Sequence, residues 1–486
     1  MATDAASSST DRHTGVIGLA VMGENLALNI ERNGFPISVF NRTAARTQEF
    51  MAQRAGGLNV HAAYELKDFV ASLTRPRRII VLVKAGAPVD AVLEEIGPML
   101  EAGDIVVDGG NSFFRDTERR SAASQGGAYD FVGMGVSGGE EGALWGPSLM
   151  PGGPAAAYKI LEPMLTAISA KSEFGACVTH VGPGAAGHYV KMVHNGIEYG
   201  DMQLIAETYD IMRRALGLGA AQIASIFDGW NQGKLSSYLI EITAQVLACK
   251  DIDTGKPLVD LVLDTAEQKG TGRWTSQSAL DLGTPIPVID AAVLARSMSS
   301  MKERRVAASP ILAGAGPAET PPENAGKVLG DLENALFFAK ISSYAQGMAL
   351  LRAASDTYAW DLDLAETARI WTGGCIIRAK LLEPIMTAFK DSPKLDNLLL
   401  APHITDSINE TAGAARVAVS VASTHGIPCP ALSAALNYVD AYRQEWLPAN
   451  LIQGQRDFFG AHTYRRIDKP GVFHTDWTTG ATIEIS

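Results

Sequence analysis

Residues 14–34 constrain the fold most, because they read as a short apolar strand, a glycine-rich turn and an amphipathic helix that ends at a glycine. Gly18 permits a tight turn, Gly23 permits close packing of the helix, and free amides at the helix N-terminus can receive a pyrophosphate. The usual G-x-G-x-x-G pattern has a glycine where this chain has Ala20. Because the turn lies between a strand and a helix, the sequence still predicts a dinucleotide-binding βαβ unit.

The second expected strand, residues 36–40, ends in Asn41, Arg42 and Thr43. Proteins that bind NAD usually have an acidic residue at this strand end, where it accepts the ribose hydroxyls. Arginine instead offers a planar, permanently charged group to a 2′-phosphate, and Thr43 can bind phosphate and cap the next helix. The position therefore predicts NADP rather than NAD, although Arg42 is also compatible with an ordinary exposed charge.

Strands and helices continue to alternate to about residue 185, with further strands expected at 78–83 and 104–108. Such alternation is typical of a parallel sheet covered on both faces, so we expect an α/β Rossmann-type domain over residues 14–185. Ligands of such sheets bind beyond the carboxyl ends of the strands, which places Lys84 and Asn111 near a nicotinamide and its substrate, although Lys84 alone is also compatible with an ordinary surface residue. A third strand end leads into a glycine-rich loop, residues 133–142, whose backbone can approach a ligand closely.

From about residue 186 the strand pattern stops, and long amphipathic segments predict an all-α domain over residues 186–445. Its first helix carries Lys191, His194, Asn195 and Glu198 on one stripe, because residues three, four and seven apart share a helix face. Lys and Glu at such spacing usually form a solvated face. Here the helix directly follows a dinucleotide-binding half, so we interpret the amine, imidazole, amide and carboxylate as a proton-transfer site.

Two more clusters lie further along the chain. Residues 269–274, K-G-T-G-R-W, place two cations and flexible backbone at one helix exit, which suits a phosphate. Arg296, in a helix expected over 288–305, is a second candidate anion contact, although a lone helical Arg is more often solvated or ion-paired. The tail, residues 446–486, carries Arg456 and His462 among aromatic residues, which indicates a segment that docks, with another subunit as one candidate surface.

Composition excludes several classes of function. A net charge of −12 argues against a nucleic-acid-binding protein, so an anionic ligand needs a local basic pocket. The four cysteines include no C-x-x-C pair, which indicates a reducing, cytoplasmic compartment. Residues 1–13 read as a disordered extension, and no apolar run approaches the ~20 residues of a membrane span. The nine histidines show no metal-ligand spacing, so we expect chemistry without a metal.

The ordered set of motifs resembles one family, the decarboxylating 6-phosphogluconate dehydrogenases, over nearly the whole chain after residue 13. The motifs are G-L-A-V-M-G from Gly18, N-R-T from Asn41, D-G-G-N-S from Asp108, G-V-S-G-G-E-E-G from Gly135, K-M-V-H-N-G-I-E-Y from Lys191, K-G-T-G from Lys269 and Q-R-D-F-F-G-A-H from Gln455. The chain departs from the usual family residues at Leu144, Trp145 and Arg273. The resemblance implies a homodimer in which the C-terminal tail threads the neighbouring subunit. It also implies oxidation and decarboxylation of 6-phosphogluconate to ribulose 5-phosphate and CO2 with reduction of NADP, a step of the oxidative pentose phosphate pathway and of gluconate utilization.

Residue roles follow from the same resemblance. Lys191 resembles the family's general base and Glu198 its general acid. Contacts to the sugar acid are implied for Asn111, Ser137, Gly138, Gly139, His194 and Asn195. Contacts to the phosphate end are implied for Tyr199, Lys269, Thr271 and Arg296, with Arg456 and His462 supplied by the partner subunit. Cofactor contacts are assigned to Gly18, Leu19, Ala20, Val21, Met22, Gly23, Asn41, Arg42, Thr43, Val83, Lys84, Ala85 and Asn111.

Two other functions remain compatible with parts of the sequence. A β-hydroxyacid dehydrogenase that stops at the keto acid shares the Rossmann-type half and the lysine base, but it does not need the phosphate cluster or a tail acting on another subunit. A non-catalytic NADP-binding protein does not need Lys191, Asn195 or Glu198, and all three are present.

Overall fold

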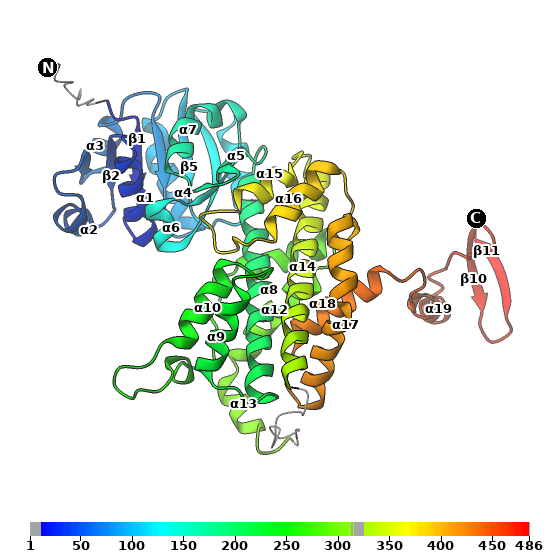
Figure 1. Cartoon of the computed structure of the whole chain (residues 1–486). Helices are drawn as coiled ribbons and strands as arrows, with labels where there is room; N and C mark the ends of the chain where they lie inside the picture. Colours follow the sequence, from blue (N-terminus) through cyan, green and yellow to red (C-terminus); the bar gives the residue numbers. More distant parts are fainter. Residues whose placement is uncertain (1–10, 313, 315–324, 486) are drawn as a thin grey trace. The chain divides into compact units, whose positions relative to one another are not determined.

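The structure is a computed structural model that describes residues 11–312, 314 and 325–485. It divides into two compact units, one ending at Ala435 and the other comprising Leu436–Ser486 (Figure 1). The expected disordered extension, residues 1–13, lies mostly outside the described residues. No helix of the described residues combines the length and the apolar character that a membrane span requires.

A seven-stranded sheet forms the N-terminal part, in the order β3-β2-β1-β4-β5-β6-β7. Strands β1 to β6 are parallel, and β7 pairs antiparallel with β6. The strands are β1 Thr14–Ile17, β2 Ile37–Phe40, β3 Val60–Ala63, β4 Arg78–Val81, β5 Asp104–Asp108, β6 Tyr129–Ser137 and β7 Ser148–Gly152. This order confirms the expected Rossmann-type α/β fold.

Helices cover both faces of this sheet, and each face has its own apolar core. One core combines side chains of α1 (Val21–Arg32) and α7 (Ala155–Ile168) with the strands, and includes Leu26 and Leu161. The other combines α3 (Leu66–Ala71) and α4 (Ala87–Ile96) with the opposite strand faces, and includes Phe69. The remaining helices of this part are α2 Ala44–Phe50, α5 Phe114–Ser124 and α6 Gly139–Trp145.

Two sequence-based boundaries need correction. The strand expected over 78–83 ends at Val81, because the chain bends at Val83 into the loop before α4. The glycine-rich segment 133–142 is not one loop, since Gly133 to Ser137 complete β6 and Gly139 opens α6. Glycine is tolerated in this strand because a helix lies directly against it, as the site geometry below shows.

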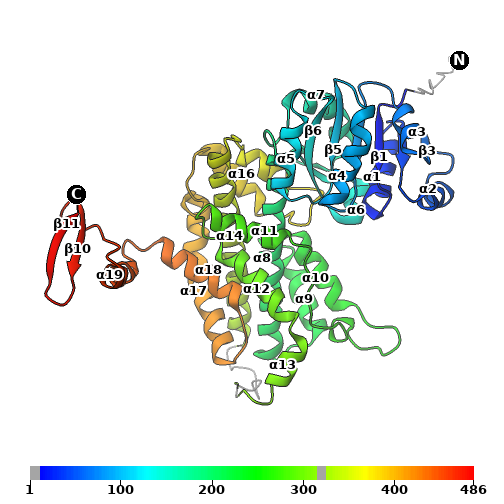
Figure 2. The ribbon, with the colours of Figure 1, turned by 180° about the vertical axis from the view of Figure 1, so that it is seen from behind.

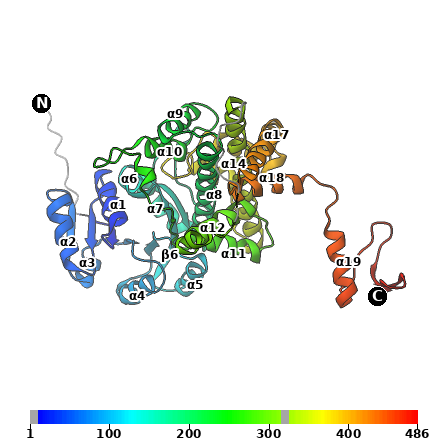
Figure 3. The ribbon, with the colours of Figure 1, turned by 90° about the horizontal axis from the view of Figure 1, so that it is seen from below.

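The helical part is arranged around α8 (Ala186–Arg214), which packs against α11, α12 and α14 (Figures 2 and 3). The other helices of this part are α9 Ala220–Trp230, α10 Tyr238–Ala248, α11 Thr271–Asp281, α12 Pro287–Ser299, α13 Lys302–Ala308, α14 Ala325–Tyr358, α15 Leu364–Ile370, α16 Leu382–Asp391 and α17 Pro402–Thr424, and α18 Pro430–Tyr442 spans the boundary between the two units. The single helix expected over 288–305 is wrong, because the chain breaks between α12 and α13 at Ser300 and Met301.

The C-terminal unit has its own secondary structure, a helix α19 (Ala449–Gly460) followed by the hairpin β10 (Val472–Asp476) and β11 (Ala481–Ile485). It is built around the fully buried carboxylate of Asp457. That carboxylate accepts hydrogen bonds from the backbone amides of Thr463 and Thr475, from His474 Nδ1 and from the indole of Trp477. Burial raises the pKa of Asp457, but these hydrogen bonds outweigh it and lower the pKa to about 2.

Candidate functional site

Helix α8 lies directly on the sheet because glycines remove side chains from the contact. A Cβ on Gly135 of β6 would lie 2.4 Å from the Cβ of Lys191, and a Cβ on Gly133 would lie 2.9 Å from His188 Nδ1. A Cβ on Gly187 would lie 2.2 Å from the carbonyl oxygen of Gly133. Strand β6 therefore fixes the height and rotation of the first turns of α8, and with them the position of Lys191.

Lys191 is buried and has few partners for its charge. Its Nζ lies 3.4 Å from His194 Nδ1, one turn along the helix. Burial lowers the pKa of Lys191, while the Glu198 carboxylate and the Cys375 thiol group counteract this shift. A lysine in this position can give up its proton more readily than an exposed one, as a general base requires.

His194 connects the helix to the end of β6. Its Nε2 lies 3.2 Å from Ser137 Oγ and its Nδ1 lies 3.2 Å from Asn195 Oδ1, and its ring meets Trp371 edge to face at 5.5 Å. Burial, together with the neighbouring Lys191 charge, lowers the pKa of His194 well below 6.5. The imidazole is therefore neutral at pH 7 and serves as a hydrogen-bonding group.

Glu198 lies one turn beyond His194, and its Oε2 is 3.9 Å from His194 Nδ1. Burial raises the pKa of Glu198, Lys191 and Arg296 oppose the rise, and the Asp201 carboxylate adds to it. Asp201 accepts a 2.7 Å hydrogen bond from Lys340 of α14, and both of these side chains are almost fully buried. A carboxyl group with a raised pKa suits a general acid.

The turn after β5 carries Asn111 and is organised by Asp108. The carboxylate of Asp108 accepts from the Gly110 amide at 3.1 Å and from Ser112 Oγ at 2.7 Å. This leaves Asn111 exposed at the carboxyl end of the strand. The fold places it beside the loop after β6, which continues the same edge of the sheet.

The backbone at Gly138 and Gly139 adopts φ values of +119° and +64°, which favour glycine. A Cβ on Gly138 would also lie 2.6 Å from the carbonyl oxygen of Gly374. The loop after α15 therefore supports the glycine loop from behind, and Gly374 itself accepts a hydrogen bond from the Ser148 amide. This arrangement exposes backbone amides of the loop where a carboxylate or hydroxyl group can approach.

The far end of the stripe combines aromatic and cationic groups. The guanidinium carbon of Arg296 lies 3.5 Å from the ring centroid of Tyr199, and Arg296 also donates to the Glu267 carbonyl. Thr271 opens α11, and Thr275 one turn later donates to the Met192 carbonyl of α8. Lys269 is exposed two residues before Thr271. These groups suit an anion at the open end of the stripe.

The turn after β1 fits a dinucleotide. Gly18 has φ +101°, and a Cβ there would lie 2.4 Å from the Leu82 carbonyl oxygen, while a Cβ on Gly23 would lie 1.8 Å from the Gly18 carbonyl oxygen. The Leu19 amide donates to Asn41 Oδ1 at 3.0 Å, so Asn41 holds the turn in place. The backbone of this turn is packed closely against the start of α1, and the first amides of α1 stay available to a pyrophosphate.

At the end of β2, where a 2′-phosphate is expected to bind, the side chain of Arg42 is a cation without a bonded partner among the described residues. Within the residues that the structure describes, no hydrogen bond or ion pair involves the exposed side chain of Arg42. Thr43 occupies the N-cap position of α2, but its side chain makes no capping hydrogen bond, so the expected cap is wrong. The exposed Lys84 follows β4 in a loop with Val83 and Ala85. Arg42 and the Thr43 hydroxyl are both free to meet an anion.

The structure brings most of the predicted residues into the first unit but not all of them. Arg456 and His462 belong to the C-terminal unit, where Arg456 donates to Gln453 and His462 lies beside Phe459. Sequence reasoning missed Trp371, Gly374 and the Asp201–Lys340 pair. The paired glycines after Trp371 were a usable signal, because adjacent glycines often mark a close backbone approach.

Comparisons with known proteins agree with this geometry. Residues 13–182 match the family model described as the NAD binding domain of 6-phosphogluconate dehydrogenase, and residues 187–477 match the one described as its C-terminal domain. The chain is 57% identical to a decarboxylating 6-phosphogluconate dehydrogenase of Synechocystis sp., over 96% of this chain and 98% of that protein. It is 54% identical to an NADP(+)-dependent, decarboxylating relative of Bacillus subtilis, over 95% and 98% respectively.

A solved structure gives the same result. The 6-phosphogluconate dehydrogenase of Plasmodium falciparum, described in its apo form and in complex with its cofactor NADP+ and with its substrate 6-phosphogluconate, is 46% identical. It superposes with a TM-score of 0.93 over 96% of this chain and 100% of that chain. The Rossmann-type sheet and the helical part therefore match in both sequence and arrangement.

Proposed function

The chain belongs to the 6-phosphogluconate dehydrogenase family, and we infer that it oxidises and decarboxylates 6-phosphogluconate to ribulose 5-phosphate and CO2 while NADP is reduced to NADPH. The observation that carries this inference is the stripe of buried Lys191, buried His194 and partly buried Glu198 beside the end of β6. A buried amine and a partly buried carboxyl two helical turns apart suit the two proton transfers of this reaction.

NADP is the cofactor that the site supports. The exposed guanidinium of Arg42 at the end of β2 is suited to a 2′-phosphate, and the Gly18–Gly23 turn has the close backbone approach that a pyrophosphate needs. The relative from Bacillus subtilis is named as NADP(+)-dependent. When bound, NADP takes up the hydride from C3 of the substrate.

Lys191 acts first, as a free amine that accepts the proton of the C3 hydroxyl group. Its lowered pKa makes the neutral form accessible. The resulting ammonium donates a hydrogen bond to the C3 carbonyl oxygen of the 3-keto acid. There it stabilises the negative charge that develops as the bond to the carboxyl group breaks and CO2 leaves. We propose that no metal takes part in this step.

Glu198 then acts as a carboxylic acid and protonates the enediol at the carbon that carried the carboxyl group. This carbon becomes C1 of the product, ribulose 5-phosphate. Its raised pKa keeps the proton available. His194, neutral and bonded to Ser137, orients the substrate hydroxyls between Lys191 and Glu198, with Asn195 and Asn111 as further contacts. Ser137, Gly138 and Gly139 present the loop after β6 to the carboxylate end of the sugar acid.

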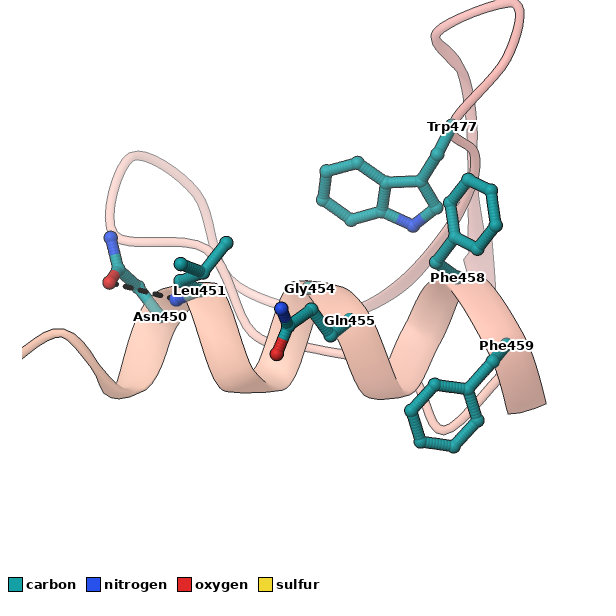
Figure 4. Close-up of a pocket in the computed structure, with 7 residues that line it drawn as sticks. All are labelled: Asn450, Leu451, Gly454, Gln455, Phe458, Phe459 and Trp477. Atoms are coloured by element: carbon teal, nitrogen blue, oxygen red, sulfur yellow. Dashed lines mark hydrogen bonds between the residues drawn. The ribbon is translucent and has the colours of Figure 1, made fainter.

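The phosphate end of the substrate lies toward Tyr199, Lys269, Thr271 and Arg296 in this proposal. We propose that the partner subunit of a homodimer adds Arg456 and His462 to the same end. The C-terminal unit supports a docking role, because Leu451, Phe458 and Phe459 of α19 are 65%, 62% and 73% exposed. With Trp477 they line an apolar groove that a second protein surface would cover (Figure 4).

An assay of both products tests the function. Purified protein is incubated with 6-phosphogluconate and NADP in the presence of a chelator, and NADPH absorbance and CO2 release are followed together. We expect equal yields of NADPH and CO2, and much slower turnover with NAD. NADPH without CO2 would instead identify a β-hydroxyacid dehydrogenase that stops at the keto acid, and binding of NADP without turnover would identify a non-catalytic protein.

A further inference from the structure

Two loops at the carboxyl edge of the sheet carry proposed ligand contacts, and one buried arginine joins them. The loop after β4 carries Lys84 and ends at Gly86, and the turn after β5 begins at Asp108 and carries Asn111. Arg120 of α5 contacts both loops and is 3% exposed. Its Nη2 donates to the Gly86 carbonyl at 3.0 Å, and its Nη1 donates to Asp108 Oδ2 at 3.3 Å.

A third bond fixes the guanidinium plane. Arg120 Nε donates to Asp90 Oδ1 of α4 at 2.8 Å, so the side chain contacts the loop after β4, the helix that follows this loop and the end of β5. Hydrogen bonding to Arg120 is the largest cause that lowers the pKa of Asp90, with Arg119 contributing less. Asp108 is also buried, so Arg120 compensates two carboxylates at once.

Only a planar, forked side chain can make this set of contacts. A guanidinium carries five N–H donors in fixed directions, whereas a lysine ammonium is a single point that cannot reach a carbonyl and two carboxylates on different elements together. Asp108 in turn accepts from the Gly110 amide and from Ser112, so the Arg120 contact is one step from the backbone that positions Asn111.

We propose that Arg120 is a positioning residue for the reaction, whose guanidinium holds the loop that carries Lys84 and the turn that carries Asn111 at a fixed separation. This inference rests on the proposed function, since both loops are assigned to the nicotinamide and substrate end of the site. The neighbouring Arg119 provides a matched control, because it also donates to Asp90 but its side chain is 57% exposed and it contacts neither loop.

The test compares Arg120→Gln, Arg120→Lys and Arg119→Gln with the parental enzyme. Kinetics give KM and kcat for 6-phosphogluconate and NADP, and amide hydrogen exchange of the ligand-free protein reports residues 84–87 and 109–112. We expect KM for both ligands to rise about tenfold in Arg120→Lys, with faster exchange in both segments, because small displacements of positioning groups are costly. Arg119→Gln should match the parental enzyme in both measurements.

Arg120→Lys keeps a buried positive charge, so it separates positioning from the loss of a charge partner. A lysine variant with parental KM values and parental exchange in both segments would overturn the inference, even if its melting temperature fell.

If neither Arg120 variant folds, Asp90→Asn tests the inference instead. This variant removes the Asp90 charge but leaves the ion pair between Arg120 and Asp108 intact. Faster exchange confined to residues 84–87 would then support the inference, and unchanged exchange would contradict it. A parental protein that does not turn over 6-phosphogluconate contradicts the proposed function, while the exchange measurement still decides the role of Arg120.

Discussion

Burial moves the pKa values of Lys191 and Glu198 in opposite directions, which suits the two tasks proposed for them. Desolvation disfavours the charged form of each group, so the lysine loses its proton more easily and the glutamic acid keeps its proton longer. Their opposite charges limit both shifts, because each charged form stabilises the other. The titration of each group therefore depends on the charge of the other.

The pH dependence of the oxidation step follows from this coupling. Oxidation that needs neutral Lys191 should rise with pH through a pKa below 10.5, whereas the later protonation of the enediol by Glu198 should weaken as pH passes the raised pKa of Glu198. In Glu198→Gln the carboxylate that raises the pKa of Lys191 is gone, so the rising limb should move to lower pH. The measurement is kcat/KM for NADPH formation against pH in both proteins. A limb that stays at its parental position would show that Glu198 does not raise the pKa of Lys191.

At the residue scale, the sequence predicted which groups share the stripe but not what surrounds them. Helical spacing placed Lys191, His194 and Glu198 on one face, and their contacts in the structure follow that spacing. The edge-to-face contact of His194 with Trp371 joins residues far apart in the chain, and no local pattern encodes it. The individual ligand contacts stay predictions, since they depend on bound molecules.

At the element scale, the contact of α8 with β6 depends on strand glycines that have no space for a side chain. Gly135→Ala would force a methyl group to within 2.4 Å of the Lys191 Cβ. We expect it to lower the free energy of unfolding by about 1–3 kcal/mol and to reduce kcat as Lys191 is displaced. Urea unfolding and steady-state kinetics measure the two effects.

Gly413→Ala is the control for that substitution. Gly413 lies in α17, is exposed, and has no atom within 4 Å of an added Cβ. Alanine there should raise the free energy of unfolding by about 0.5–1 kcal/mol, since glycine costs more conformational entropy in a helix. If Gly135→Ala is as well tolerated as Gly413→Ala, the close packing of β6 on α8 does not determine the position of Lys191.

The sequence predicted the alternation of strands and helices and the change to helices near residue 186, because both depend on periodic apolar residues. It did not predict the break between α12 and α13. There Ser299 and Ser300 donate their hydroxyls to carbonyls three residues earlier, and such bonds compete with the helical backbone. It also did not predict the β10–β11 hairpin, which is held by hydrogen bonds to the buried Asp457 carboxylate of α19, a residue type that usually indicates a surface.

At the scale of the whole molecule, the proposed dimer makes each active site a product of two chains. This arrangement is testable with hybrids of a Lys191→Met subunit and an Arg456→Ala/His462→Ala subunit, each of which should be impaired as a homodimer. A hybrid contains one site with an intact lysine and an intact tail only if the tail acts on the partner. Random pairing makes half of the dimers hybrids, so we expect about a quarter of the parental activity.

The control for that experiment is the same mixture kept under conditions in which the subunits do not exchange between dimers. It should show only the activities of the separate homodimers. Activity that stays at this level after the subunits have been shown to exchange would mean that Arg456 and His462 serve the site of their own chain. The acid–base stripe on α8 would be unaffected by that result, because Lys191 and Glu198 belong to one chain in either arrangement.

Lys191 as the base of the oxidation step is the assignment on which the other roles depend, and Lys191→Met tests it most directly. Rates of NADPH formation and CO2 release are measured together with NADP affinity. We expect both rates to fall by at least about 10²-fold, because a positioned base contributes that much, while the dissociation constant for NADP changes less than a few-fold. NADPH formation within a few-fold of the parental rate would show that another group removes the proton.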